Sequence, residues 1–512
     1  GANDQLPSPK AIEDACLRLI RVADTKLGGF GAAPKFPHAT DLDLLLRCYH
    51  SDRDAKKLHV VTCSLDAMAA GGIFDHVGGG FARYSVDAHW LVPHFEKMLY
   101  DNALLARLYV DAFQVTGVPR YEQVVRQTLE YLLREMRDEA GGIHSSEDAD
   151  SEGIEGKFYV WKPEQVKAVI GEDRGERWCA IYDVTPHGNF EGNSIPRLKA
   201  PIGEFAQSHN IDPEVLQKEL SDDREKLRAA RDTRVHPGRD DKVLMGWNAL
   251  ACEAFATAGA VLDEPRFVEA AEKIAGFIWS KMRRADGRFH HAYRRGHAHV
   301  PAFQDDLANF IVACIAVFRA SGRARWIDRA SQVATQMLDH YEDREAGGFF
   351  YTADDAETVI TRHKEWHDGS VRSGNGVAAL ALLELAELTG DTRIAEAASR
   401  TLIAAREVIE KQSAASAHLL VALDRHQHRN EQIVIAASDW ENAAPLRRLY
   451  HHTYRPHTTL SWVIGEAPET GPVQWLNADK HPLGDEPTLY VCRDYRCEQP
   501  FTGAAARDAL ST

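Results

Sequence analysis

A repeated pair of helices constrains the fold of this chain more than any other feature of its sequence. Four segments, beginning near residues 100, 246, 304 and 373, each combine a strongly apolar helical run, a short turn and an amphipathic helical run. Runs that are apolar nearly all round predict helices buried on both sides, and their partners predict helices with one polar face. Gly-rich corners recur beside the pairs, at residues 28–30, 141–143, 286–289 and 347–349. Repeated helical hairpins predict either a solenoid or a closed ring.

The spacing of the repeats separates those two architectures. The first two copies begin about 150 residues apart and the next two about 60 apart, because an irregular insertion occupies residues 141–246. A solenoid keeps a tight period, whereas a ring tolerates long loops at one end. We therefore predict a mainly α fold, an (α/α)6 toroid of six hairpins over residues 1–428, with an irregular helical array as the alternative. The short strand-like runs EQIVIAAS, TTLSWVIG and TLYVCR, with a helix between the first two, predict a small α/β appendage over residues 429–512.

Composition narrows the classes of partner. The 512 residues carry 60 Lys and Arg against 76 Asp and Glu, a net charge of −16, which argues against nucleic-acid binding and against an anionic-membrane anchor. The beginning of the chain has no apolar signal region, and the longest apolar run is too short to cross a bilayer. The eight cysteines include no CxxC pair and predict reduced thiols in a cytoplasmic protein. Cys492 and Cys497 form the one close pair, for which a disulfide or a metal is the less favoured alternative.

The densest group of candidate site residues precedes the first buried helix, within residues 74–105. Aromatic and charged side chains alternate there, a pattern that suits stacking on a sugar ring while its hydroxyl groups are hydrogen-bonded. A purely structural role, such as capping the helix, is the alternative. The candidates are Arg83, Tyr84, Trp90, His94, Glu96, Lys97, Tyr100, Asp101 and Asn102.

Carboxylates and tryptophans mark three further segments. The crowded acids around Asp148 and Asp150, followed by Trp161, suit a general acid, because neighbouring carboxylates can raise one another's pKa. Trp247 and Asn248 precede the second buried helix. Asp305 and Asp306 precede the third, and Asp306 aligns with Asp101 in the repeat. Such acids are either helix caps or inward-facing site residues, and both readings stay open.

The last cluster precedes the fourth buried helix. His367 beside Asp368 suggests a base with an orienting acid, and Trp366, Arg372 and Asn375 accompany them. Metal ligation is the rival role for the histidines. No known ligand spacing occurs, and the His-rich segments 290–299 and 451–457 are predicted to lie on the surface. Nucleotide-binding loops and the GxSxG elbow are missing from the sequence, so we expect no metal and no cofactor.

These motifs together resemble a known family. GGFGAAPKFPH, GGIFDHVGGGFARYSVDAHWLVPHFEKMLYDNA, EDADSEG, EGKFYVW, DDKVLMGWNALA and WHDGSVRSGNG are similar to segments of the thioredoxin-domain-containing proteins related to spermatogenesis-associated protein 20. The resemblance covers most of residues 27–380. It implies a toroid similar to those of N-acylglucosamine 2-epimerase and six-hairpin glycosidases, preceded by a thioredoxin-like domain. This sequence starts where the toroid should start, so either a thioredoxin-like domain was removed from it or this member lacks one, and a thioredoxin-like domain or partner stays an open alternative.

The expected substrate is a small carbohydrate. The first hypothesis is a cofactor-independent sugar isomerase or 2-epimerase, in which histidine moves the proton on the carbon next to the carbonyl. Its residues would be His367 with Asp368 as base, His94 with Glu96 as partner, and Arg83, Lys97 or Arg372 on the enediolate oxygens. The second hypothesis is a glycoside hydrolase that pairs Asp148 or Asp150 with Asp101 or Asp306. A noncatalytic carbohydrate-binding or regulatory scaffold is the third.

Overall fold

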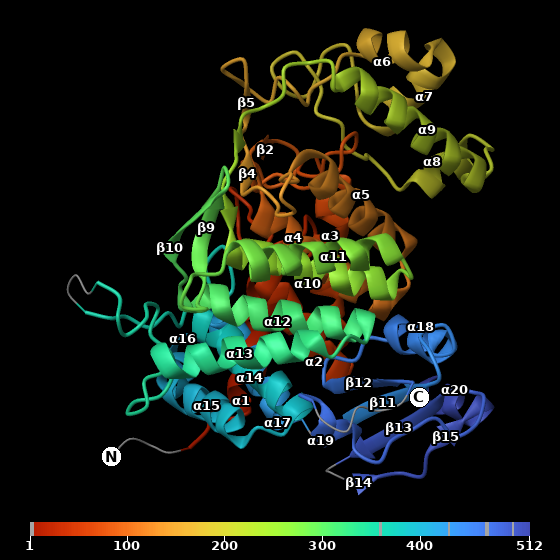
Figure 1. Cartoon of the computed structure of the whole chain (residues 1–512). Coiled ribbons are helices and arrows are strands. Elements are labelled where there is room, and N and C mark those ends of the chain that lie inside the picture. The colour runs from red at the N-terminus through yellow and green to blue at the C-terminus, as the bar shows by residue number, and fades with distance from the viewer. Residues whose placement is uncertain (1–4, 358–360, 429–430, 466–470, 494–495, 512) are drawn as a thin grey trace.

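Six inner helices form a closed ring. The computed structural model describes the chain except residues 1–4, 358–360, 429–430, 466–470, 494–495 and 512 (Figure 1). Each inner helix packs against the next, and the sixth packs against the first. In chain order they are α2 (Ala39–Asp52), α4 (Leu99–Thr116), α10 (Met245–Val261), α12 (Gln304–Ser321), α14 (Gly374–Thr389) and α17 (Ala417–Gln427). Contacts join the starts of α4, α10, α12, α14 and α17 in turn, so these five helices run in the same direction.

Outer helices cover the ring and complete the hairpins. Five of them pack on the inner helix that precedes them: α3 (Ala55–Ala70), α5 (Pro119–Glu135), α11 (Pro265–Lys281), α13 (Arg325–His340) and α15 (Thr392–Ala404). The sixth inner helix is covered by α1 (Lys10–Val22), from the other end of the chain. Short helices, α16 (Arg406–Gln412) and η1 (Ser413–Ala415), lead into α17. The predicted (α/α)6 toroid is confirmed, with the N-terminal helix supplying the outer member of the last pair.

Three Gly-rich turns, at residues 78–81, 141–143 and 347–349, are tied to the inner helices by asparagines. In each case the side-chain Oδ1 accepts a hydrogen bond from one backbone N–H at 2.7 or 2.8 Å, and Nδ2 donates to the same residue's carbonyl at 2.9 or 3.0 Å. The pairs are Asn102 with Phe81, Asn248 with Ile143, and Asn375 with Phe349. We call these three residues the asparagine clamps. They explain why an Asn recurs at the start of the buried helices.

The insertion between α5 and α10 forms a separate helical lobe beside the ring (Figure 1). It holds α6 (Pro163–Ile170), α7 (Glu172–Ile181), α8 (Ile202–Ser208) and α9 (Pro213–Arg231), packed around their own apolar cluster. A buried ion cluster anchors it: Asp75 accepts from Arg231 and Lys97 at 2.9 Å each. Short strands line the loops: β1 (Tyr84–Ser85), β2 (Pro93–His94), β3 (Lys97–Met98), β4 (Ser146–Glu147), β5 (Asp150–Ser151), β6 (Ile154–Glu155), β7 (Arg239–Asp240), β8 (Val243–Leu244), β9 (His290–Arg294) and β10 (His297–Pro301).

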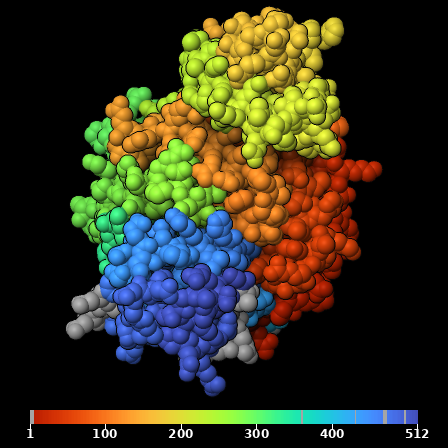
Figure 2. Space-filling view, turned by 90° about the vertical axis from the view of Figure 1, so that its right-hand side faces the viewer, coloured from red at the N-terminus to blue at the C-terminus, as the bar shows by residue number. Residues whose placement is uncertain are grey.

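The C-terminal segment folds as a small sheet with helices, and its first strand begins four residues after α17 ends. The strand order is β12 (Thr458–Ile464), β11 (Glu431–Ala437), β13 (Thr488–Arg493), β14 (Arg496–Cys497), with β15 (Phe501–Thr502) also on β13. β11 is parallel to β12 and antiparallel to β13. Its helices are α18 (Ala444–His452), α19 (Gln474–Asn477) and α20 (Gly503–Ser511). This domain, blue in Figure 2, lies against the ring, with α18 on α10 and α19 on α14.

The structure tests two expectations: that the cysteines are reduced, and that no segment spans a membrane. Cys492 and Cys497 face each other across β13 and β14 and form a disulfide, so the prediction of reduced thiols is wrong for this pair. The other six cysteines are free. Among the described residues, no helix is both long and apolar enough to span a bilayer.

Candidate active site

The first predicted cluster gathers where the inner helices begin. β1 and β2 pair Tyr84 with His94, and the two rings stack with centroids 5.2 Å apart. His94 Nε2 lies 3.5 Å from Glu96, which also binds Arg83 at 3.2 Å. His94 Nδ1 lies 2.9 Å from Glu155, on the β5–β6 hairpin. The structure therefore brings four predicted residues together, and adds Glu155, which the sequence analysis missed.

Tyr100 and Trp247 continue this surface from α4 to α10. Their rings meet edge to face, with centroids 4.8 Å apart. The Tyr100 hydroxyl lies beside Arg83 and Ser370, although burial keeps its pKa above the usual range. Next to it, one Asp101 oxygen is buried without a hydrogen-bond partner among the described residues. Burial raises the pKa of Asp101 well above its ordinary range.

The two aspartates at the start of α12 play different parts. Asp306 accepts from the backbone N–H groups of Gly246 and Phe303 and lies against His291 Nδ1, all at 2.8 Å. It is a cap, and it holds α10 and α12 together. Asp305 has a buried oxygen with no partner in the described chain. Burial, followed by the charges of Asp306 and Glu365, raises the pKa of Asp305 to about 8, so its carboxyl is mostly protonated at neutral pH.

His291 is a second residue that the sequence analysis missed, because it lies in a His-rich segment that was predicted to be surface. Burial lowers its pKa, but the bond to Asp306 outweighs burial and the net pKa is raised. Asp306 and Asp101 occupy equivalent positions in the repeat, but the two side chains have different roles. Asp306 uses both oxygens in hydrogen bonds, whereas Asp101 keeps one unused.

The predicted pair of His367 and Asp368 is not formed. Asp368 accepts from the backbone N–H of Ser373 at 2.8 Å and of His418 at 2.9 Å, and so joins the starts of α14 and α17. Burial raises the pKa of Asp368 to about 6, despite these two bonds. His367 is exposed and contacts Gln412. Asp368 therefore orients backbone groups rather than an imidazole.

Below the helix starts, the ring encloses a hollow of about 1180 Å³, part of it open to solvent. It reaches from the first turns of α2 and α17 to residues 450–458 of the C-terminal domain. Charged side chains line it in pairs, an arrangement that can bind hydroxyl groups through several directed hydrogen bonds. The pairs are Arg47–Asp43 at 3.1 Å, Arg372–Glu253 at 2.9 Å, Arg107–Glu253 at 3.4 Å, Arg319–Glu384 at 3.4 Å and Arg107–Asp111.

One histidine of this hollow has no partner. His418, at the start of α17, is 1% exposed, and neither ring nitrogen has a hydrogen-bond partner among the described residues. Burial, then the charges of Arg372 and Arg47, keep the pKa of His418 well below its usual range, so the ring is neutral. The sequence offered one signal: SAAS before an apolar run marks the start of the sixth inner helix.

Asp101 and Asp305 stand above this hollow. Each lies seven residues, about two helical turns, before a lining residue of the same helix, Leu108 on α4 and Val312 on α12. Both aspartates therefore share the lumen-facing side of their helices. The mouth of the ring and its charged interior therefore lie along the same face of these two helices.

Several predicted binding residues have structural roles instead. The asparagine clamps Asn102, Asn248 and Asn375 are fully buried, and both N–H groups of each amide are bonded to backbone oxygens. Trp90 is fully buried and donates to the Leu27 carbonyl at 3.0 Å. Lys97 belongs to the ion cluster with Asp75.

The remaining predicted residues lie at the edge of the site or outside it. Trp161 is buried in the insertion, 4.2 Å from the Arg234 guanidinium. Trp366 packs on Gly348, where a Cβ would lie 2.5 Å from its ring. Asp148 and Asp150 are exposed, and only the hairpin partner of Asp150, Glu155, reaches the site.

Solved structures share this fold at low sequence identity. A D-mannose isomerase aligns with a TM-score of 0.52 and 12% identity, over 78% of this chain and 85% of that one. Cellobiose 2-epimerase from Bacillus thermoamylovorans B4167 aligns with a TM-score of 0.50 and 10% identity, over 77% and 85%. These likenesses show the toroid fold.

Sequence relatives give the family. No family model matches the chain. Human spermatogenesis-associated protein 20 is 30% identical over 97% of this chain and 68% of its own length. A Caenorhabditis elegans protein, B0495.5, is 28% identical over 93% of this chain and 70% of its own length. The chain belongs to the spermatogenesis-associated protein 20 family.

Proposed function

We propose that this chain is a cofactor-independent sugar isomerase or 2-epimerase. The observation that carries the proposal is His418, a neutral histidine with two unpaired nitrogens in a charged hollow, beside Arg372 and Arg47. A neutral imidazole is the form that accepts a proton. A cellobiose 2-epimerase and a D-mannose isomerase share this fold with TM-scores of 0.50 and 0.52, which supports the same choice.

His418 replaces His367 as the base in this proposal. It removes the proton from C2 of an open-chain aldose, and the C–H electron pair forms the C1–C2 double bond of an enediolate. Arg372 and Arg47 stabilise the negative charge on the oxygens. Return of the proton to C1 gives the ketose, while Glu253, in the same hollow, relays the O2 hydroxyl proton to O1.

Side chains at the mouth of the ring, where the inner helices begin, bind the sugar and provide a second proton donor. Trp247 and Tyr100 offer aromatic surface to the sugar, and Arg83 and His94 offer hydrogen bonds to the hydroxyl groups. Asp305, protonated at neutral pH, is the group we assign to return a proton to the opposite face of C2. Return of the proton on that face gives 2-epimerisation.

The test is proton NMR in heavy water with a panel of free aldoses and ketoses. We expect deuterium at C2 together with a new isomer, and His418→Gln should slow the exchange about 10³-fold. His367→Gln is the matched control and should keep wild-type exchange, because that histidine is exposed and contacts Gln412. Equal rates in the wild type and His418→Gln would remove the assignment.

A glycoside hydrolase is the second candidate, on one specific observation. Asp101 and Asp305 share the mouth, and each has a raised pKa and an unpaired buried oxygen, as a general acid requires. Release of reducing sugar from short glycosides, abolished by Asp305→Asn and unchanged by His418→Gln, would favour this activity over the isomerase.

A further inference from the structure

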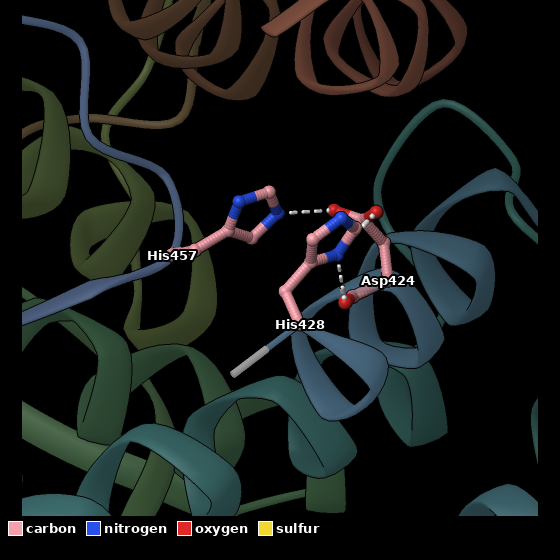
Figure 3. A group of neighbouring side chains, drawn as sticks. All are labelled: Asp424, His428 and His457. Atoms are coloured by element: carbon pink, nitrogen blue, oxygen red, sulfur yellow. Dashed lines mark hydrogen bonds and ion pairs between the residues drawn. The ribbon is translucent and has the colours of Figure 1, made fainter. Parts of the chain in front are cut away.

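A second cluster of ligand-type side chains lies where the ring meets the C-terminal domain. Asp424 and His428 belong to the end of α17, and His457 immediately precedes β12 (Figure 3). One donor atom from each of the three lies within 4.8 Å of the other two. His457 Nε2 is 2.6 Å from one Asp424 oxygen, and His428 Nδ1 is 3.0 Å from the other.

We propose that Asp424, His428 and His457 bind one divalent transition-metal ion, with Zn²⁺ the first choice, that fastens the C-terminal domain to the ring. Two imidazoles and a carboxylate are ligands that Zn²⁺ accepts at about 2.0–2.2 Å. Ligand atoms of one tetrahedral zinc are then about 3.3 Å apart. To direct a nitrogen at the same ion as His457, His428 must rotate out of its stack on that ring.

The surroundings favour a fixed site. Asp424 is 3% exposed, and the His457 side chain is 13% exposed. Arg425, the neighbour of Asp424 on α17, binds the His457 carbonyl oxygen, which fixes the backbone of the third ligand against the helix. The His428 side chain is 40% exposed, so the fourth coordination position faces water. The next imidazole, His50, has its ring 6.0 Å from that of His457.

A hydrogen-bonded triad without metal is the competing interpretation. His428 Nδ1 also lies 2.8 Å from the Asp424 carbonyl oxygen, so metal binding through Nδ1 must replace that bond and place the proton of the neutral ring on Nε2. The two imidazoles stack with centroids 4.0 Å apart and planes at 12°. Two parallel rings so close repel each other when both are charged, whereas neutral rings ligate a cation together.

The experiment uses the full chain, stripped with a chelator and titrated with Zn²⁺ and Co²⁺. We expect one equivalent of Zn²⁺ by elemental analysis after dialysis, visible Co²⁺ absorption that Zn²⁺ removes, and a Tm higher by about 2 °C or more with Zn²⁺. His457→Gln should weaken binding at least ~100-fold. His452→Gln is the matched control, since that exposed histidine lies outside the cluster and should leave binding unchanged.

Two outcomes would overturn the proposal. One is a stripped wild-type chain that takes up no Zn²⁺ from micromolar solution. The other is equal Zn²⁺ binding by the wild type and His457→Gln, which would assign the metal to the free cysteines. Asp424→Asn, checked for folding by circular dichroism, repeats the test on a second ligand. Sugar turnover is not a readout, so the result is independent of the proposed function.

Discussion

Two sets of buried polar side chains in the ring differ in how completely they are hydrogen-bonded. The asparagine clamps at the helix starts use both of their N–H groups in bonds to the backbone. In the hollow, neither the ring nitrogens of His418 nor the Nη1 of Arg47 has a hydrogen-bond partner in the part of the chain that the structure describes. A buried polar group without a partner costs about 1–3 kcal/mol. The clamps therefore stabilise the fold, whereas the unpaired groups cost stability unless water or a ligand in the hollow satisfies them.

The largest expected effect comes from breaking a clamp. Asn248→Ala leaves the buried N–H and carbonyl of Ile143 without partners, so we expect unfolding to become easier by about 2–4 kcal/mol. Urea unfolding monitored by circular dichroism measures it. Asn193→Ala is the control, since the side-chain hydrogen bond that it removes is exposed. Stability unchanged in Asn248→Ala would show that the clamps are dispensable.

Sequence alone predicts the ring because periodicity and repeat spacing are local properties of the chain. The buried helices lie at the predicted residues, and the Gly-rich corners recur where they were expected. The asparagines were misinterpreted, since a repeated motif does not reveal whether its amide faces a ligand or a backbone. Asn102, Asn248 and Asn375 were assigned to substrate binding, and all are fully buried.

The candidate site was predicted only in part, for two physical reasons. His418 reaches Arg372 and Arg47 only because the ring closes, which joins α17 to α2 from distant parts of the sequence. His367 and Asp368 are adjacent in an irregular segment, yet their side chains bind different partners. Adjacency along the chain was taken for contact in space, whereas successive side chains of an extended segment point to opposite sides.

The next effect, smaller per pH unit than the loss of a clamp, is the pH dependence of stability around Asp305. Its folded pKa of about 8 exceeds the ordinary 3.8, so the folded state binds the proton more tightly than the unfolded state. The contribution to stability is fully present below about pH 4 and is lost as pH rises towards 8, by at most about 1.4 kcal/mol per pH unit. Asp305→Asn should flatten that decline in urea titrations from pH 5 to 8. An identical decline in both proteins would mean that Asp305 ionises normally.

His418→Leu tests whether the unpaired imidazole in the hollow lowers the stability of the fold. Removing an unpaired buried imidazole eliminates its desolvation cost, so we expect stability to stay equal or to rise by about 1 kcal/mol. Activity should be lost in the same variant. Thermal unfolding beside the heavy-water exchange assay measures both. Destabilisation by 2 kcal/mol or more would place His418 among the structural residues, with the clamps.

The smallest effect is expected at the mouth, at Trp247. Its ring is half-buried and meets Tyr100 edge to face, so it offers apolar surface to a sugar without touching the proposed base. Trp247→Phe keeps an aromatic face but reduces its area, and we expect KM to rise about 3–10-fold while kcat stays near the wild-type value. Steady-state kinetics on the sugar found by NMR gives both constants.

Trp90→Phe is the structural counterpart: it loses the bond to the Leu27 carbonyl and should lower stability without changing KM. A fall in kcat at unchanged KM for Trp247→Phe would show that Trp247 acts in the chemical step. It would then be wrong that the helix starts only bind the sugar while the proton is transferred in the hollow.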